Sequence, residues 1–415
     1  MGIIVMMSRG AASNTVSAIR AVLGQRLGDG LRALYLYGSL STGIYQAGQS
    51  DVNLLAIIDE DVDLLDIRTI LMPVWQEYAP ILRKAPLIAT ETSLNRHLTL
   101  NPILAHHLHT NGELLEGQDL LPGPVEIDPL ERISRFVTLA IRTSLAVAPS
   151  LLSEKKAYEV TGKLKSLYRQ YYARPADKKD PPIELLASVQ QGLLSELEAY
   201  PHFYFDDHEM VDAPPLLNDL RAIYEMGNRL ILVFPDLEPE SMAERITSVN
   251  WPAVADRVAE QYRGIQVTTA AELRLMMQFN TSATHYLRSY DHAWGMNPLA
   301  DIQISPWRVF QDLARYPSEL LLSTLPHAYI STADADLAML VHDLHNKLLN
   351  IQLRNELLCR IDQVEVTLPP YPIPGRDEPL SIRIDAIASH LDWWTEYYSS
   401  AMLEAREKLP QVTKG

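Results

Sequence analysis

Apolar and polar positions in the N-terminal part of the chain follow two alternating patterns. Compact apolar runs predict β-strands buried on both faces, and apolar side chains at helical spacing predict the helices between them. Strands that alternate with helices are typical of a mixed α/β domain. The predicted strands are Leu31–Tyr37, Val52–Ile58, Pro86–Thr90 and the short Glu113–Gly117, and the predicted helices are Asn14–Leu27, Leu64–Tyr78 and Asn101–Thr110.

The pattern changes beyond Asp128, where helical spacing dominates and strand signals are few. Segments rich in proline and charge separate the helices at 174–182 and 201–215. The sequence shows no internal repeat. The predicted helices are Ile133–Leu152, Glu154–Tyr172, Ile183–Tyr200, Leu216–Phe234, Trp251–Tyr262, Ala270–Tyr290, Trp307–Leu313, Ala333–Asp362 and Asp385–Lys408.

These patterns predict an α+β fold class. A mixed β-sheet with flanking helices is expected in residues 1–124, and a large α-helical region is expected after it. That region divides into domains at 125–240 and 241–415, or forms one continuous helical domain. The length of 415 residues suits two or three domains, each able to bury its own core.

Charge and composition narrow the classes of partner. The chain has 52 acidic and 36 basic residues, a formal net charge of −16, which disfavours general binding of nucleic acid. A small cationic substrate or a protein partner suits this charge better, and assembly as a homo-oligomer stays open. No apolar stretch is long enough for a membrane span, and the single cysteine, Cys359, fits a reducing compartment. We therefore expect a cytoplasmic protein.

Candidate chemistry is concentrated between the first two predicted strands. The first strand ends at Gly38-Ser39, and the second opens with Asp51-Val52-Asn53. Amides beside a glycine can hold phosphate oxygens, because no side chain blocks their approach. Side chains two residues apart on a strand point to one face, about 6–7 Å apart. That spacing suits a pair of Mg²⁺ ions that clamp the attacking and leaving oxygens of a transferred phosphoryl group.

The Gly38-Ser39 and Asp51-Val52-Asn53 spacing resembles the signature of the nucleotidyltransferase superfamily, which includes DNA polymerase β and aminoglycoside nucleotidyltransferases. The segment Asn111–Gly117 also resembles part of the antibiotic-modifying branch. The resemblance covers about a quarter of the chain, and it implies a nucleotidyltransferase-like sheet with a helical domain that lines an acceptor pocket. It also implies transfer of a nucleoside monophosphate from a Mg²⁺-bound triphosphate to a hydroxyl of a small, cationic, aminoglycoside-like acceptor.

The resemblance assigns Gly38 and Ser39 to the triphosphate, and Asp51 and Asn53 to Mg²⁺. Asn53 stands where the family has its second acid, and an amide brings no negative charge to the metals. Only Glu91, at the end of the third strand, is near enough in sequence to act as the third acid. We therefore expect a catalytically impaired or nucleotide-binding protein. The alternatives are an active enzyme that uses Asp51, Asn53 and Glu91, a protein-interaction scaffold, and a chance match.

Two further groups of polar residues have simpler explanations. His106 and His109 would share a helix face, but no second pair of ligands accompanies them, so an exposed or hydrogen-bonded group is expected rather than a metal site. The segment Phe205–Glu209 places acids beside a histidine, and a solvated loop is expected there.

Overall fold

The computed structural model divides the chain into two compact units. Unit 1 combines residues 1–127 with 309–415, and unit 2 contains residues 128–308. The division is therefore not sequential, whereas the sequence-based boundaries at 124 and 240 assumed consecutive domains. The structure describes residues 8–45, 47, 50–144, 154–177, 179–200, 203, 220–236, 248–258, 261–262, 264–281, 284, 287–288, 291–361, 375 and 377–408. The segment Phe205–Glu209 and the side chain of Cys359 lie outside the described residues.

Unit 1 contains the predicted N-terminal sheet, and its four predicted strands are confirmed. Strand β1 (Leu31–Tyr37) lies between β2 (Asn53–Ile58) and β4 (Glu113–Gly117) and is antiparallel to both. Strand β3 (Leu87–Ala89) runs parallel to β2 at the edge of the sheet.

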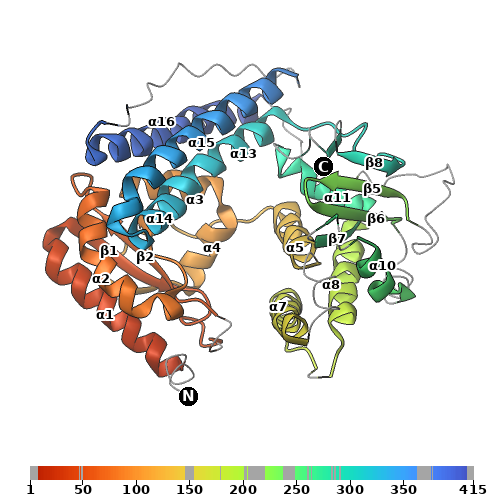
Figure 1. The fold of residues 1–415 in the computed structure, drawn as a ribbon, viewed down its shortest axis with the longest axis horizontal. Helices are drawn as coiled ribbons and strands as arrows, with labels where there is room; N and C mark the ends of the chain where they lie inside the picture. Colours follow the sequence, from red (N-terminus) through yellow and green to blue (C-terminus); the bar gives the residue numbers. More distant parts are fainter. Residues whose placement is uncertain are drawn as a thin grey trace. The chain divides into compact units, whose positions relative to one another are not determined.

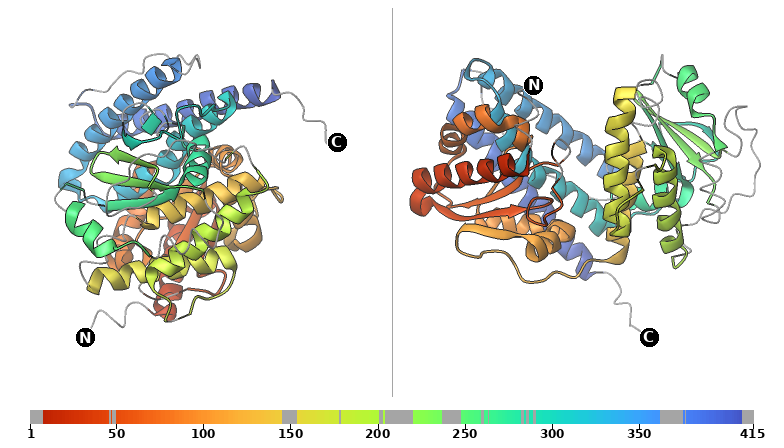
Figure 2. Two further views of the ribbon diagram at one scale, coloured as in Figure 1. Left: turned by 90° about the vertical axis from the view of Figure 1, so that its right-hand side faces the viewer. Right: turned by 90° about the horizontal axis from the view of Figure 1, so that it is seen from below.

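Helices cover both faces of this sheet (Figures 1 and 2). Because side chains alternate along a strand, Leu34 and Leu36 of β1 enter the core formed with α1 (Arg9–Leu27) and α2 (Leu64–Leu82). Ala33 and Tyr35 enter the opposite core, formed with α3 (Glu91–Leu100) and α4 (Pro102–Asn111). Helix α4 confirms the prediction from Asn101-Pro102, while α3 was not predicted.

The C-terminal segment of unit 1 is helical, as predicted. It contains α13 (Pro306–Glu319, shared with unit 2 in its first turn), the π-helical turn η4 (Leu320–Thr324), α14 (Leu325–Ser331), α15 (Asp334–Ile361) and α16 (Leu380–Glu407). Polar contacts join these helices to the N-terminal segment. His97 Nδ1 lies 2.7 Å from Ser318 Oγ, and Arg96 Nη1 donates to Asp392 at 2.7 Å. Unit 1 is thus held together by groups far apart in the sequence.

Unit 2 contains a second sheet, so the prediction of a large α-helical region over residues 125–415 is wrong for this unit. Its helices are α5 (Pro129–Ser144), α7 (Glu154–Tyr172), α8 (Pro182–Leu197), α10 (Trp251–Val258) and α11 (Ala270–Gln278). Its strands are β5 (Ala222–Met226), β6 (Arg229–Phe234), β7 (Gly264–Thr269) and β8 (His292–Gly295). Strands β5 and β6 occupy most of the predicted helix Leu216–Phe234.

The two sheets share one topology. The first has the order β3-β2-β1-β4 and the second has the order β7-β6-β5-β8. The strand that comes first in the sequence, β1 or β5, is antiparallel to both of its neighbours. The next two strands in the sequence, β2 and β3 or β6 and β7, are parallel to each other. The prediction that the chain has no internal repeat is therefore wrong.

Local details repeat as well as the strand order. Residues 31–38, LRALYLYG, match 220–227, LRAIYEMG, at five of eight positions: Leu31/Leu220, Arg32/Arg221, Ala33/Ala222, Tyr35/Tyr224 and Gly38/Gly227. A capping box opens the helix after the third strand of each sheet, at Thr90 and at Thr269.

The last strand of each sheet ends at a glycine in the same conformation. Gly117 and Gly295 have φ of 80° and 83°. A Cβ on either would lie 2.0 Å from the carbonyl oxygen of Arg32 or Arg221. Glycine is required at both positions, because only its lack of Cβ allows this approach and this φ.

Some helices pack in the unit of the other sheet rather than against the sheet that precedes them in the sequence. Helix α5, which follows the first sheet in sequence, packs against β7 and α11 of unit 2. The turn η4 and helix α16, which follow the second sheet, pack against β3 and α3 of unit 1. No helix within the described ranges is long and apolar enough to cross a membrane.

Candidate functional site

The candidate site lies at the end of the first sheet where β1 finishes and β2 begins. Tyr37 is paired with Asn53 across the two strands, so the turn after β1 lies beside the start of β2. Gly38 has φ of 86°, and a Cβ there would lie 2.7 Å from Asn53 Nδ2. The structure therefore brings Gly38 and Asn53 together, as predicted, and glycine makes room for the amide.

The turn after Gly38 is held by its own hydrogen bonds. The Thr42 amide and the Ser41 hydroxyl both donate to Gly38 O, at 3.2 and 3.0 Å, and the Ile44 amide donates to Ser39 O at 2.9 Å. Within the described part of the chain, no acceptor is assigned to the amides of Ser39 and Leu40. Such amides in a fixed turn are suitable donors for an anion.

Asp51 is engaged by a residue that the sequence did not single out. Its Oδ1 lies 3.4 Å from Nη1 of Arg83, the residue that ends α2, and both side chains are about one-third exposed (33% and 38%). Tyr45 lies close to the same pair. Burial raises the pKa of Tyr45, the positive charge of Arg83 opposes this rise, and the negative charge of Asp51 adds to it.

Arg83 adopts a backbone conformation that usually favours glycine. It has φ of 57°, and its amide donates to Ala79 O at 2.8 Å to end the helix. A left-handed residue with a side chain costs about 1–2 kcal/mol relative to the right-handed form. The ion pair with Asp51 is one contact that this conformation allows.

Glu91 is not brought together with Asp51. In the parallel ladder, Leu55 is paired with Leu87. Asp51 lies four residues before Leu55, and Glu91 lies four residues after Leu87. A shift of eight residues at about 3.3 Å each places them on the order of 25 Å apart, at opposite ends of the sheet. Glu91 is instead the first residue of α3 and is exposed.

The strand position that does lie beside Asn53 carries no acid. Extending the Leu55–Leu87 pairing by two residues brings Ala85 opposite Asn53. Ala85 is buried, and Arg83 comes two residues before it. Among the residues that the structure describes, no cluster of three or more His, Cys, Asp or Glu side chains could hold a metal ion.

Helix α4 contributes one histidine to the neighbourhood of the site. The ring of His107 packs edge-on against Tyr37 at 6.4 Å between centroids, and Asn111 Nδ2 lies 3.2 Å from His107 Nδ1. Burial raises the pKa of Tyr37 to about 12. His106 and His109, the pair considered for a metal, are exposed.

A second cation lies beside the turn. Nη2 of Arg9, at the start of α1, would be 3.8 Å from a Cβ placed on Gly43. Neither Arg9 nor Arg83 was predicted, because they are distant in sequence from the motif. The sequence did contain one signal for Arg83: the basic pair Arg83-Lys84 comes just before the strand predicted at Pro86–Thr90.

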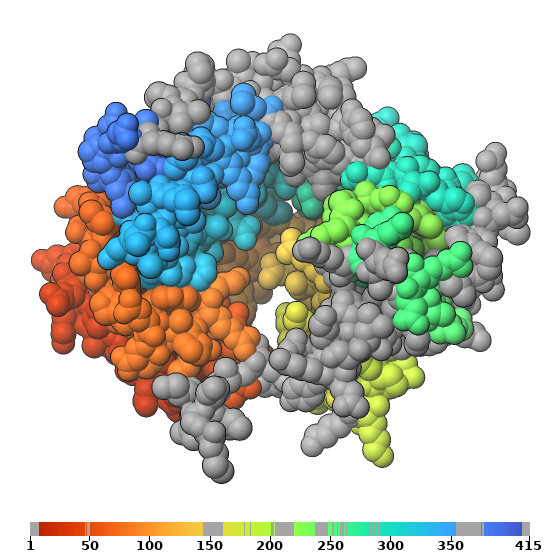
Figure 3. All heavy atoms as spheres, viewed as in Figure 1, coloured from red at the N-terminus to blue at the C-terminus, as the bar shows by residue number. Residues whose placement is uncertain are grey.

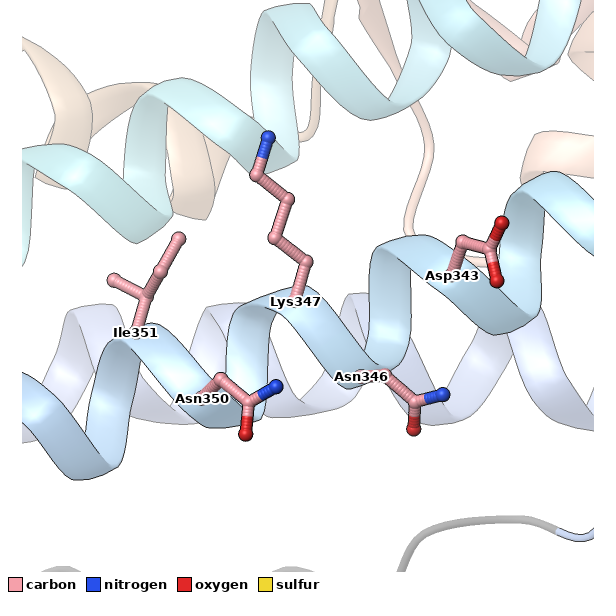
Figure 4. A pocket seen from close by; sticks show the side chains of 5 residues that line it. All are labelled: Asp343, Asn346, Lys347, Asn350 and Ile351. Carbon is pink, nitrogen blue, oxygen red and sulfur yellow. The ribbon is translucent and has the colours of Figure 1, made fainter. Parts of the chain in front are cut away.

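A separate groove of about 600 Å³ lies along α15 in unit 1 (Figure 4). Figure 3 shows the blue C-terminal helices of this unit against its orange N-terminal segment. The residues that line the groove all come from one helix, and they are Asp343, Asn346, Lys347, Asn350 and Ile351. Polar residues that recur every three to four positions are typical of the solvent-facing side of a helix. The turn at Gly38, where β1 and β2 meet and where Asp51 pairs with Arg83, is the stronger candidate.

The comparisons with known proteins find no family model that matches the chain and no curated protein with significant similarity to it. The site must therefore be interpreted from its own geometry.

Proposed function

We propose that the first sheet of unit 1 is a nucleotidyltransferase-type domain that binds a nucleoside triphosphate without transferring it. Support comes from the mixed sheet, from the Gly38-Ser39 turn between its two central strands, and from the packing of Asn53 on that turn. The fixed turn and its amides suit the phosphates of a nucleotide.

The proposed loss of transfer depends on one observation: the guanidinium group of Arg83 lies beside the carboxylate of Asp51. Two-metal catalysis needs several carboxylates, because Mg²⁺ gives up its water reluctantly and relies on charged ligands. Asp51 instead meets Arg83 at 3.4 Å. A positive charge beside Asp51 opposes the binding of a divalent cation at the same place.

The alternative of an active enzyme requires Glu91 to share a metal with Asp51. Metal–oxygen bonds of about 2.0–2.6 Å limit two ligands of one ion to about 5 Å apart. The strand register separates these residues by on the order of 25 Å.

We expect ATP to stabilise the protein without being consumed. At about 100 times its Kd, a ligand adds about 2.7 kcal/mol, which raises Tm by a few degrees. No release of pyrophosphate from Mg²⁺-ATP is expected, with or without aminoglycosides or polyamines. Restoring the acid with Asn53→Asp is not expected to start the reaction, because Arg83 still engages Asp51 and Glu91 remains remote.

Two assays on the full chain test this proposal. Thermal unfolding with and without ATP measures binding, and a pyrophosphate assay measures transfer. Pyrophosphate release that Asp51→Ala abolishes would show an active transferase and contradict the proposal. No stabilisation by any nucleoside triphosphate would remove the nucleotide-binding function itself.

A further inference from the structure

We infer that the Gly38 turn is a metal-independent polyphosphate site, in which Arg83 takes the place of Mg²⁺ and Asp51 is the site's own competing anion. This inference rests on the proposed nucleotide binding and specifies how it occurs. The ligand class is a polyphosphate monoester or free polyphosphate, recognised by its charged oxygens.

Arg83 has the chemistry that this role needs. A guanidinium group presents paired N–H donors that match two oxygens of one phosphate group. Its Nη1 lies 3.4 Å from Asp51 Oδ1, and both side chains are about one-third exposed (38% and 33%). Ion pairs of this exposure are weak, so a phosphate with two negative charges can displace the carboxylate.

The backbone of Arg83 gives an independent reason to assign its side chain a role. The left-handed conformation at the end of α2, with φ of 57°, favours glycine or asparagine. A residue held in a sparsely populated region of backbone conformation points to a function of that residue. Here the function is to place a cation beside the start of β2.

The charge around the turn also suits an anion. Arg9 and Arg83 approach it from α1 and from the end of α2, and Asp51 forms an ion pair with Arg83. The local balance is positive in a chain whose formal net charge is −16. Two cations from separate elements therefore lie near the turn and the start of β2.

The role of Asp51 is opposite to its role in a metal site. If Asp51 held Mg²⁺, its removal would weaken the binding of nucleotide. If Asp51 competes with phosphate for Arg83, its removal takes away a competing negative charge and strengthens binding. The two mechanisms predict changes of opposite sign from one substitution.

Calorimetric titration of the full chain with sodium tripolyphosphate and with ATP tests the inference, in EDTA and in Mg²⁺ at low ionic strength. We expect binding in EDTA that Mg²⁺ does not strengthen. Arg83→Gln should weaken it about 10-fold or more, the usual effect of losing a charge-assisted contact. Asp51→Asn should tighten it about 3-fold to 10-fold.

Arg32 and Asp59 provide a matched control pair. Their side chains are 3.2 Å apart with exposed fractions of 43% and 40%, at the other end of the same sheet. Arg32→Gln and Asp59→Asn should leave the Kd within about 2-fold. Circular dichroism of each variant reports whether it has folded.

Three outcomes overturn the inference: no binding of tripolyphosphate in EDTA, an unchanged Kd in folded Arg83→Gln, or weaker binding by Asp51→Asn. If ATP binds only with Mg²⁺, the inference is wrong while nucleotide binding by the protein stands. If neither ATP nor tripolyphosphate binds under any condition, both the inference and the proposed function are wrong.

Discussion

Replacing Arg68 by methionine is expected to lower the free energy of unfolding of unit 1 by about 3 kcal/mol. Arg68, on α2, is 3% exposed. Its guanidinium group donates to Tyr329 O at 3.0 Å, to Thr332 O at 2.9 Å and to the carboxylate of Asp334. The group also lies over the ring of Tyr329, 5.3 Å from its centroid. Removing it leaves two backbone carbonyl groups of the C-terminal segment without their donor.

The size of the effect follows from burial of the carbonyls rather than from the ion pair. The side chain of Asp334 is 82% exposed, so its charge is screened by water. Asp334→Asn should therefore cost less than about 1 kcal/mol. Arg20→Met, which breaks an exposed pair with Glu116, should cost no more than about 0.5 kcal/mol.

Guanidinium denaturation followed by circular dichroism measures these differences, and hydrogen exchange of α2 and α14 assigns them to unit 1. Equal effects of Arg68→Met and Asp334→Asn would show that the ion pair carries the stabilisation. An effect of Arg68→Met below about 1 kcal/mol would contradict the importance of this connection between the N-terminal and C-terminal segments.

The sequence predicts the first sheet well because each of its strands is bounded by a clear signal. Gly38 ends β1, Asp51 precedes β2, and Asn101-Pro102 opens α4. The hydrophobic runs of β1 and β2 are too short and too continuous for amphipathic helices. Helix α3 was missed because its start depends on Thr90 and Ser93, a capping pair without the usual acid.

The second sheet was missed although one signal for it was present. Gly227-Asn228 forms a two-residue connection between β5 and β6, which is typical of a hairpin. The polar residues Glu225 and Arg229 interrupt the apolar pattern and made it compatible with a helix. Strand β7 is buried along its whole length, so it has no alternation that periodicity can detect.

The exchange of helices between the two halves and the pairing at Asp51 depend on tertiary structure. The local sequence pattern of α5 does not indicate whether the helix packs against β7 or against the first sheet, which precedes it in the sequence. In the same way, the contact between Asp51 and Arg83 depends on how α2 ends and returns to β3. The motif spacing identified the place of the candidate site, and the geometry changed the expected role of its acid.

Replacing Glu272 by glutamine is expected to stabilise unit 2 at alkaline pH and to have little effect in acid. Glu272 is fully buried at the start of α11. Its Oε2 accepts from the Thr269 amide and the Thr268 hydroxyl, both at 3.0 Å, and from Gln190 Nε2 at 3.3 Å. Its Oε1 has no hydrogen-bond partner among the described residues, and a neutral carboxyl group places its proton there.

Burial above all raises the pKa of Glu272 from 4.5 to about 7, and the nearby charge of Asp236 adds to the rise, while the three hydrogen bonds oppose it. The folded state therefore binds this proton more tightly than the unfolded state. The resulting stability is complete below pH 4.5 and is lost as the pH rises through 7. The difference of about 2.5 between the pKa values in the folded and unfolded states corresponds to about 3 kcal/mol of stability.

Glutamine keeps the accepting oxygen at the cap and carries no charge at any pH. At pH 8.5 we expect the free energy of unfolding of Glu272→Gln to exceed that of the unaltered protein by about 2–3 kcal/mol. At pH 4.5 we expect the two free energies to be equal within about 0.5 kcal/mol. Denaturation at both pH values, with hydrogen exchange of α8 and α11, measures this difference, and the exposed Glu198→Gln serves as the control. If Glu272→Gln were less stable than the unaltered protein at pH 8.5, the carboxylate would be ionised and stabilised in the folded state. The helix cap of α11 would then depend on a buried negative charge rather than on a neutral acid.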